Sequence, residues 1–493
     1  MNYLVVFFEV IFAFSEVIIA IFSLHYCYIV LRNLVLPKQG EDESVQTEQE
    51  VAFVTFQVPI FNEKHIVREF IANIVNIDYP SDRFEVQLLD DSTDETSCLI
   101  KNEIKKYPSI NFLHIKRSIR TDFKAGALNE GLITAKGTFI AIFDIDFKPP
   151  RDFLRKTLPN FHENEKLAFV QTRWGHKNKE STLTEAIALG IDNHFLIEQP
   201  VRNNIGVMNF NGTCGIFRKD AIIDAGLWDG SILAEDLDLS YRLYMKNWTA
   251  KYSENVVCQG EIPNKISSYK TQQYRWAKGS SQASRKNLSS IMRSKELSHT
   301  QKAESIFHHL GYFIQLFIFI NILSTIPLLY YQSAILLANW GILLFIINSL
   351  ASTMYLLTSF KLKMNLMATI KSIFILTMIT VGISWKTSIA TIEGLFHRSG
   401  EFKRTPKGIS SNKSSYLTKS RIDLLIEISL IIYLLFGIGI TIMHNSYIPI
   451  LYLSFCLIAF SYIFMLDLNE QLNLETVSIR IPQSLKKIFG SSN

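Results

Sequence analysis

Two aspartates, Asp144 and Asp146, stand at the end of an apolar run that begins at Phe139. A continuous run of this kind, rich in Ile and Phe, is typical of a strand buried on both faces of a parallel sheet. We predict that the strand covers residues 139–147, so that the two carboxylates point the same way. Such a pair suits an oxygen-binding divalent cation on a diphosphate, although a turn with two solvated acids gives the same pattern.

Two further acidic pairs, Asp90-Asp91 and Glu235-Asp236, lie where predicted strands end or loops return. The stretch Gln272-Gln273-Tyr274-Arg275-Trp276 follows them. Its arginine offers rigid donors for phosphate or hydroxyl groups, and its tryptophan offers a flat face for a sugar ring. The same stretch would also anchor a helix at a membrane surface. Each of these motifs is common by itself, so only their occurrence together in this order indicates a function.

The elements that must position these residues alternate between strands and helices. Apolar runs predict strands at residues 51–58, 85–89 and 110–115, and helical spacing predicts helices at 66–77, 96–106 and 125–135. This alternation is typical of a doubly wound, parallel α/β sheet. No G-x-G-x-x-G follows the first strand and no G-x-x-x-x-G-K-[ST] occurs anywhere, which excludes those two kinds of nucleotide site.

The composition indicates a membrane protein with one soluble region. Of the 493 residues, 48% are hydrophobic. A helix needs ~20 apolar residues to cross a bilayer, and the chain has five apolar stretches near or above that length, before and after its soluble region. They occupy residues 3–31, 308–330, 335–360, 422–443 and 447–466. Residues 51–290 have the mixed composition of a soluble domain, and no internal repeat stands out.

The cysteine spacing and the net charge argue against three further classes of protein. The five cysteines show no C-x-x-C spacing, so neither a zinc site nor a disulfide framework is indicated. The net charge of +5 is modest for this length and gathers near the membrane ends. We interpret it as membrane topology and lipid contact rather than nucleic-acid binding.

Basic residues predict the orientation in the membrane. Arg32 and Lys38 follow the first apolar stretch and no basic residue precedes it, which places residues 51–290 in the cytoplasm. Segment 366–397 has a short apolar core between Lys371 and Lys386, so we predict an interfacial or re-entrant segment rather than a crossing.

These assignments predict five crossings and eight regions. The regions are a transmembrane helix at 1–36, a linker at 37–50, a cytoplasmic domain at 51–290 with interfacial helices toward its end, a transmembrane hairpin at 305–360, the interfacial segment at 366–397, a cytoplasmic loop at 398–421, a second hairpin at 422–466 and a cytoplasmic tail at 467–493.

The series of motifs resembles the inverting, processive family-2 glycosyltransferases, whose signature is Asp, Asp-x-Asp, an acidic-Asp pair and Gln-x-x-Arg-Trp. Within that family, which includes cellulose, hyaluronan and chitin synthases, the chain is most similar to the plant mannan and glucomannan synthases and their bacterial relatives. The resemblance covers residues 51–290 and reappears at 402–407. It implies a GT-A-type nucleotide-sugar-binding domain inserted in a helical transmembrane bundle.

The resemblance also implies a role for each matched residue. Asp236 is the expected general base for the acceptor hydroxyl, and Asp144 and Asp146 are expected to hold Mg²⁺ or Mn²⁺ on the diphosphate. The nucleotide is expected at Pro59, Asn62, Glu63, Asp91, Lys124 and Asp144. The acceptor glycan is expected at Asn211, Gly212, Thr213, Glu235, Gln272, Arg275 and Trp276. Family members commonly have Thr where this chain has Ala234.

A third part of the resemblance lies in the basic loop after residue 397. Phe402, Thr405 and Lys407 resemble the gating loop Phe-x-Val-Thr-x-Lys of cellulose synthases, with Arg404 in place of the Val. In the family this loop closes over the nucleotide, which requires a cytoplasmic position. A basic loop that binds lipid is the alternative.

We therefore expect a multi-pass membrane glycosyltransferase, of a microbial cell membrane, that polymerises a β-linked (β-1,4) glucan or glucomannan from UDP-glucose or GDP-mannose and translocates it. Two alternatives stay open: a single-transfer lipid glycosyltransferase of the ceramide-glucosylating type, and a non-catalytic transporter or scaffold. The spans after Trp276 favour the polymer-forming enzyme, because a channel needs several helices. Competent residues at every catalytic position argue against the scaffold.

Overall fold

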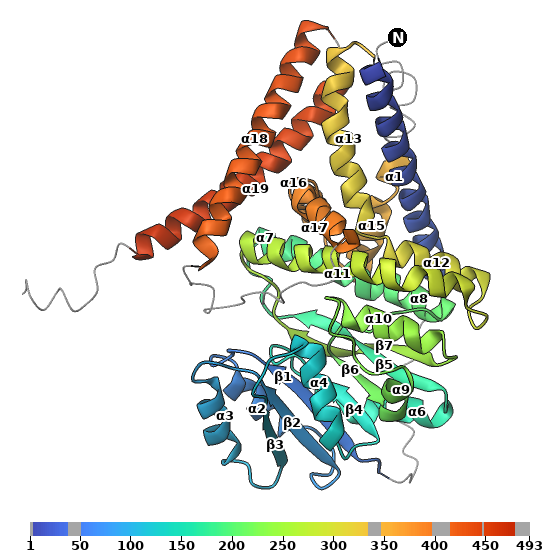
Figure 1. Cartoon of the computed structure of the whole chain (residues 1–493), viewed down its shortest axis with the longest axis vertical. Helices are drawn as coiled ribbons and strands as arrows, with labels where there is room; N and C mark the ends of the chain where they lie inside the picture. Colours follow the sequence, from blue (N-terminus) through green and yellow to red (C-terminus); the bar gives the residue numbers. More distant parts are fainter. Residues whose placement is uncertain (1–2, 38–50, 334–346, 397–414, 446–447, 479–493) are drawn as a thin grey trace, which may run out of the picture.

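The computed structural model describes residues 3–37, 51–333, 347–396, 415–445 and 448–478 (Figure 1). An α/β domain occupies one end of the molecule, and long helices rise from it as a bundle at the other. The predicted gating residues Phe402, Thr405 and Lys407, and nearly all of the predicted linker 37–50, lie outside the described residues.

A seven-stranded mixed sheet forms the α/β domain, with the strand order β3-β2-β1-β4-β6-β5-β7. The first four strands of this order run parallel, whereas β6 is antiparallel to both of its neighbours. The predicted doubly wound sheet is therefore confirmed, in a mixed form. The strands are β1 (Val54–Ile60), β2 (Phe84–Asp90), β3 (Asn111–Lys116), β4 (Phe139–Ile142), β5 (Leu167–His176), β6 (Gly215–Arg218) and β7 (Thr249–Gly260).

Two apolar cores lie on opposite faces of the sheet, and neighbouring residues of β4 divide between them. Ala141 belongs to the core that also contains Phe70 of α2, whereas Ile142 belongs to the core that contains Leu128 of α4. Successive strand side chains point to opposite faces, so an unbroken apolar run serves both cores. The three predicted helices before residue 139 are confirmed as α2 (Val67–Ile74), α3 (Thr96–Ile104) and α4 (Phe123–Thr134).

The predicted strand at residues 139–147 is wrong in its extent, because β4 ends at Ile142. Asp144 and Asp146 lie beyond it in a turn, in which the Phe147 N–H donates to the Asp144 carbonyl over 3.0 Å. The reason lies in the neighbouring strand, since β6 begins only at Gly215 and leaves β4 without that ladder partner beyond Ile142.

The first strand differs from the prediction in the opposite sense. We predicted it at residues 51–58, but β1 begins at Val54 and continues through Pro59 to Ile60. The ladder of β1 with β4 ends at Gln57, so only β2 pairs with the strand at Pro59. A proline is tolerated there because one side of the strand is already unpaired.

A layer of helices lies between the sheet and the membrane bundle (Figure 1). Its longest member is α11 (Ile266–Arg293), which carries the Gln-x-x-Arg-Trp stretch. The other helices of the domain and of this layer are α5 (Phe153–Thr157), α6 (Pro159–Glu163), α7 (Thr182–Asn193), the π-helical turn η1 (His194–Glu198), α8 (Gln199–Ile205), α9 (Lys219–Asp224), α10 (Glu235–Tyr244) and α12 (His299–His309).

Four helices among the described residues are long and apolar enough to cross a membrane, or up to five if one bent pair counts as a span. The four are α1 (Tyr3–Val35), α13 (Phe313–Tyr330), α18 (Ser415–Met443) and α19 (Ile448–Ser478). The bent pair is α16 (Leu366–Gly382) with α17 (Ser384–Phe396), at an angle of 52°. Such a bend is typical of a broken span or of a re-entrant loop, so the interfacial position of 366–397 stays a prediction.

In the bundle, one predicted crossing is described only in part, and one predicted boundary differs from the structure. Of the predicted crossing at 335–360, the structure describes only the part from residue 347, which contains the 10-residue helix α15 (Ser352–Lys361). The predicted tail from residue 467 begins inside α19, which continues to Ser478. Asp467 of α19 pairs with Lys270 of α11, and both side chains are buried.

Candidate active site

One cavity of about 970 Å³ extends from the carboxyl ends of the strands into the membrane bundle. The carboxyl ends of parallel strands are where α/β sheets bind ligands. Most of the predicted site residues line it, although they come from loops and helices far apart in the sequence. They are Pro59, Glu63, Asp91, Lys124, Asp144, Asp146, Asn211, Gly212, Glu235, Asp236, Gln272, Arg275 and Trp276.

Two predicted site residues, Asn62 and Thr213, do not line the cavity but bond to the loops that do. Asn62, in a left-handed conformation at φ 57°, accepts a hydrogen bond from the Thr93 N–H over 2.9 Å and so ties the tip of β1 to the loop after β2. Thr213 is buried, and its Oγ1 accepts from the Asp144 N–H over 2.8 Å. Both residues therefore hold in place the loops that carry the acidic groups.

Lys124 lies at the centre of the acidic groups. Its Nζ donates to Asp144 Oδ1 over 2.6 Å and to the Gly212 carbonyl over 2.8 Å. Burial lowers the pKa of Lys124, but Asp144, Glu235 and Asp236 together raise it above the ordinary value. The lysine thus stays a cation in the cavity wall, where a leaving diphosphate would need one.

Glu235 and Asp236 occupy the first turn of α10, and the Leu237 N–H donates to Asp236 Oδ1 over 2.8 Å. Burial raises the pKa of Asp236, although the Leu237 N–H and the Lys124 ammonium lower it. Burial and the charge of Asp236 raise the pKa of Glu235 to about 7. A carboxylate whose pKa is raised toward neutrality is a stronger base than a solvated one, which suits Asp236 to accept a proton.

The backbone beside Asp236 requires a glycine. Gly212 has a φ of +80°, and a Cβ added to it would lie 3.0 Å from Asp236 Oδ2. Any side chain there would be strained and would press on the carboxylate. The segment 211–213 therefore passes within contact distance of the expected base.

Two arginines near the nucleotide end were missed in the sequence. Arg117 donates to both carboxylate oxygens of Asp91, from Nε over 2.8 Å and from Nη2 over 2.5 Å. Arg120 lies over the Phe61 ring, 3.5 Å from its centroid, and lines the cavity. The basic loop after the predicted strand 110–115 could have indicated both arginines, because all parallel strands of one sheet end at the same edge.

Helix α11 contributes Gln272, Arg275 and Trp276 to the cavity wall. Burial lowers the pKa of the Arg275 guanidinium below its ordinary value, although the acids Glu235, Asp144 and Asp236 act in the opposite direction. Gln272 Oε1 is buried on the cavity wall with no hydrogen-bond partner among the described residues. Because a buried polar atom without a partner is costly, Gln272 is suited to bind a polar ligand.

Asp144 and Asp146 are the residues suited to hold a divalent metal. The part of the chain that the structure describes contains no group of three or more His, Cys, Asp or Glu residues that could hold one alone. Carboxylate oxygens are the ligands that Mg²⁺ and Mn²⁺ prefer, and Mg²⁺ commonly takes only one or two of them beside substrate phosphates. Two aspartates on the cavity wall, beside the cation Lys124, fit that arrangement.

Residues 139–385 match the family model described as "Glycosyl transferase family group 2". The match includes Asp144, Asp146, Asp236 and the Gln-x-x-Arg-Trp stretch, and it spans half of the chain. The chain therefore belongs to glycosyl transferase family group 2 and is a glycosyltransferase. This membership favours an enzyme over the non-catalytic scaffold.

The predicted likeness to mannan and glucomannan synthases is confirmed. The chain is 35% identical over 263 residues to "Glucomannan 4-beta-mannosyltransferase 1" of Oryza sativa subsp. japonica, covering 52% of this chain and 50% of that one. It is 36% identical over 262 residues to "Glucomannan 4-beta-mannosyltransferase 9" of Arabidopsis thaliana, covering 52% and 49%. The chain thus spans about half the length of the curated relatives it matches.

A solved structure of similar fold is that of "Mannosyltransferase PcManGT from Pyrobaculum calidifontis in complex with GDP-Man and Mn2+". It superimposes with a TM-score of 0.54 at 20% identity, over 79% of this chain and 99% of that one. At this identity the likeness concerns the fold. Together with the family match, it confirms the predicted GT-A-type domain with flanking long apolar helices.

Proposed function

We propose that this chain lengthens a β-1,4-linked mannan or glucomannan from GDP-mannose and leads the product into the membrane bundle, with its α/β domain in the cytoplasm. The names of its sequence relatives, glucomannan 4-beta-mannosyltransferases, support a mannosyl donor. The structure of similar fold, a mannosyltransferase solved with GDP-Man and Mn²⁺, points the same way. GDP-mannose is therefore preferred over UDP-glucose.

The observation that carries this proposal is the continuity of the cavity with a polar site inside the bundle. Glu16 of α1 accepts from Asn321 Nδ2 over 2.7 Å and from Asn348 Nδ2 over 3.0 Å, and the Tyr452 hydroxyl donates to Asn321 Oδ1 over 2.9 Å. All four residues line the cavity. Polar groups at membrane depth are costly and usually serve a function. They suit a hydroxyl-rich chain better than the hydrocarbon tails of a lipid acceptor.

In the proposed reaction the acceptor hydroxyl attacks the anomeric carbon of the donor sugar in one displacement. Asp236 takes the hydroxyl proton as the new C–O bond forms, and the bond from the anomeric carbon to the diphosphate breaks. Lys124, Arg120 and Arg275 line the cavity and would stabilise the negative charge of the leaving diphosphate. A divalent ion held by Asp144 and Asp146 would, when bound, neutralise charge on the diphosphate. One displacement inverts the anomeric configuration.

Purified protein in lipid nanodiscs, given radiolabelled GDP-mannose or UDP-glucose, tests the proposal. We expect a polymer from GDP-mannose that size-exclusion chromatography separates from free sugar and that a β-1,4-mannan hydrolase degrades. The Asp236→Asn variant is the matched control and is expected to make polymer at least about 10²-fold more slowly. Label that partitions into organic solvent would instead establish the single-transfer lipid enzyme, and polymer made from UDP-glucose alone would overturn the donor assignment.

A further inference from the structure

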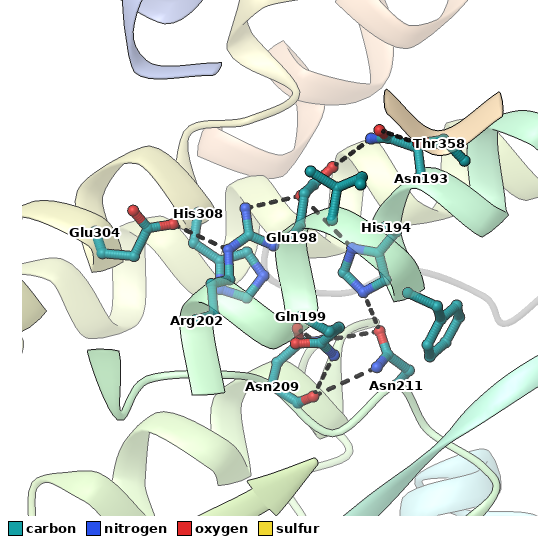
Figure 2. Close-up of polar contacts among 12 residues, drawn as sticks. Asn193, His194, Glu198, Gln199, Arg202, Asn209, Asn211, Glu304, His308 and Thr358 are labelled. Carbon is teal, nitrogen blue, oxygen red and sulfur yellow. Dashed lines mark hydrogen bonds and ion pairs between the residues drawn. The ribbon is translucent and has the colours of Figure 1, made fainter. Parts of the chain in front are cut away.

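A π-helical turn on the cavity wall carries two polar residues that the proposed reaction does not use. This turn, η1, contributes His194 and Glu198 to the cavity lining beside Asn211 (Figure 2). π-helical turns are rare and are found frequently at functional sites, because the extra residue rotates side chains out of the helical register.

His194 holds the Asn211 side chain. Its Nε2 lies 2.8 Å from Asn211 Oδ1, which also accepts from Asn209 Nδ2 over 3.2 Å. An amide oxygen can only accept, so the network assigns the donated proton to Nε2. The Asn211 backbone N–H is fixed as well, since it donates to Gln171 Oε1 over 2.8 Å.

Asn211 opens the segment 211–213, which lies against Lys124, Asp144 and Asp236. The carbonyl of Gly212 accepts from Lys124, and a Cβ added to Gly212 would lie 3.0 Å from Asp236 Oδ2. Thr213 accepts from the backbone of Asp144. A displacement of Asn211 would therefore move the acceptor side of the site relative to the base.

Glu198 is fixed beside the other nitrogen of the His194 ring. Its Oε2 lies 3.6 Å from His194 Nδ1 and 2.9 Å from Arg202 Nη2, and its Oε1 accepts from Asn193 Nδ2 over 3.1 Å. Burial raises the pKa of Glu198, but Arg202 and His194 outweigh it and lower the pKa to about 2. Glu198 is thus a carboxylate at neutral pH, on the side of the ring opposite Asn211.

The same chain of contacts reaches the N-terminal membrane helix. Arg202 Nε donates to Glu304 Oε1 over 3.0 Å, and His25 of α1 donates from Nε2 to Glu304 Oε2 over 2.8 Å. The His25 ring stacks on Phe307, with centroids 3.9 Å apart. These contacts give Glu198 a rigid anchorage that extends from the domain into the bundle.

We propose that His194, oriented by Glu198, is a positioning residue that holds Asn211 and thereby sets the acceptor side of the active site. It acts through Asn211 and is not itself a catalytic residue. This inference rests on the proposed sugar transfer. The two ring nitrogens lie between Asn211 Oδ1, at 2.8 Å from Nε2, and Glu198 Oε2, at 3.6 Å from Nδ1, so the ring has a fixed orientation.

The test compares His194→Phe with His194→Gln in the full-length protein in nanodiscs. Phenylalanine keeps a ring but cannot donate, whereas glutamine keeps an N–H that can reach Asn211. We expect His194→Phe to lower kcat by about 10-fold to 10²-fold, as small misplacements of reacting groups do. The KM for GDP-mannose should stay within about two-fold, because His194 contacts none of the nucleotide-end residues. His194→Gln should recover at least about a third of the wild-type kcat.

His176 supplies a matched control. It is a buried histidine whose Nε2 lies 3.4 Å from Asp192 Oδ1, and it does not line the cavity. His176→Gln should leave kcat unchanged. If His194→Phe fails to fold, His194→Asn makes the same comparison with His194→Gln, because the two amides differ by one methylene and only the longer one reaches Asn211.

Three results would overturn the inference. The first is a wild-type kcat in His194→Phe, and the second is a rise in its KM for GDP-mannose as large as its fall in kcat. The third is a His194→Gln variant that is as slow as His194→Phe. Each of these assumes that the wild-type protein transfers mannose, which separates this inference from the proposed function. A wild-type protein that transfers no sugar from either donor would overturn both.

Discussion

Asp236 is the residue on which the proposed chemistry depends most directly. We expect Asp236→Asn to lower turnover by about 10²-fold or more, because only the proton acceptor is lost. Binding of GDP-mannose, measured by isothermal titration calorimetry, should stay nearly intact. Turnover within a few-fold of wild type would place the base elsewhere.

Asp238 is the control for that prediction, because it is the nearest other acid of α10. It is fully buried, and its carboxylate pairs with Arg242 Nε at 2.8 Å and Lys286 Nζ at 2.7 Å. It does not line the cavity. Asp238→Asn should therefore lower stability, and leave turnover per folded molecule close to wild type.

The acidic pair also predicts a pH dependence. Burial disfavours the charged forms, so both pKa values are raised, that of Glu235 to about 7. Below its pKa a carboxyl is protonated and cannot act as a base, so kcat should rise with pH between about pH 5 and pH 8. Glu235→Gln removes the group that titrates near neutrality and should abolish the upper part of this rise. A flat wild-type profile over that range would contradict the assignment.

Metal dependence is the third prediction at the scale of residues. We expect EDTA to abolish transfer and Mn²⁺ to restore it, and Asp146→Ala to lose Mn²⁺ binding in the presence of GDP, as measured by electron paramagnetic resonance. Asp82→Ala, at an exposed surface acid, should bind Mn²⁺ as wild type does. Full activity in EDTA would remove the metal from the mechanism.

At the scale of elements, the placement of α11 depends on a buried charge cluster. Lys270, two residues before Gln272, lies 2.5 Å from Glu427 Oε1 and 3.4 Å from Asp423 Oδ2, and it contacts Asp467 as well. Its partners come from α18 and α19. The helix that carries the acceptor-facing residues is thus fixed to the C-terminal hairpin by this lysine, and also by Glu470 of α19, which accepts from the Ile266 N–H over 2.6 Å.

Lys270→Met should lower the free energy of unfolding by about 3–5 kcal/mol, because it leaves buried carboxylates without their cation. Denaturant titration in detergent micelles measures this. Lys371→Met is the control: Lys371 lies 3.4 Å from Glu185 Oε2, and both side chains are about half exposed. A pair of that kind contributes ~1 kcal/mol or less. Equal losses in the two variants would show that the cluster does not stabilise the bundle.

At the scale of the whole molecule, the proposed function requires the loop before α18 to face the cytoplasm. Residues 398–421 carry seven Lys or Arg residues and one acid, Glu401. Short loops with such an excess stay on the cytoplasmic side. The structural description resumes only at residue 415, so this orientation is predicted from the sequence.

A cysteine-labelling experiment tests the orientation. With the native cysteines replaced, Ser411→Cys should react with an impermeant thiol reagent only after the cells are permeabilised. His444→Cys, at the exposed far end of α18, should react in intact cells and serves as the reference. Labelling of Ser411→Cys from outside would overturn both the cytoplasmic loop and the gating assignment of Lys407.

The sequence by itself determined the features that depend on neighbouring residues along the chain. Apolar runs and helical spacing located β1, β2 and α4, because burial on one or both faces of an element imposes a short period on the side chains. The spacing of Asp91, Asp144, Asp146 and Asp236 identified the family, and the apolar stretches located the long helices. These signals are local, so they can be read before the chain is folded.

Only the tertiary structure decided which of these features meet. β4 ends at Ile142 because a partner strand begins 73 residues later, at Gly215, and no property of the apolar run itself marks that end. Lys124 meets Gly212 across 88 positions, and His25 meets Glu304 across 279. Such contacts depend on how packed elements bring distant backbone together. The free energy that fixes them belongs to the whole fold, so no stretch of sequence encodes them alone.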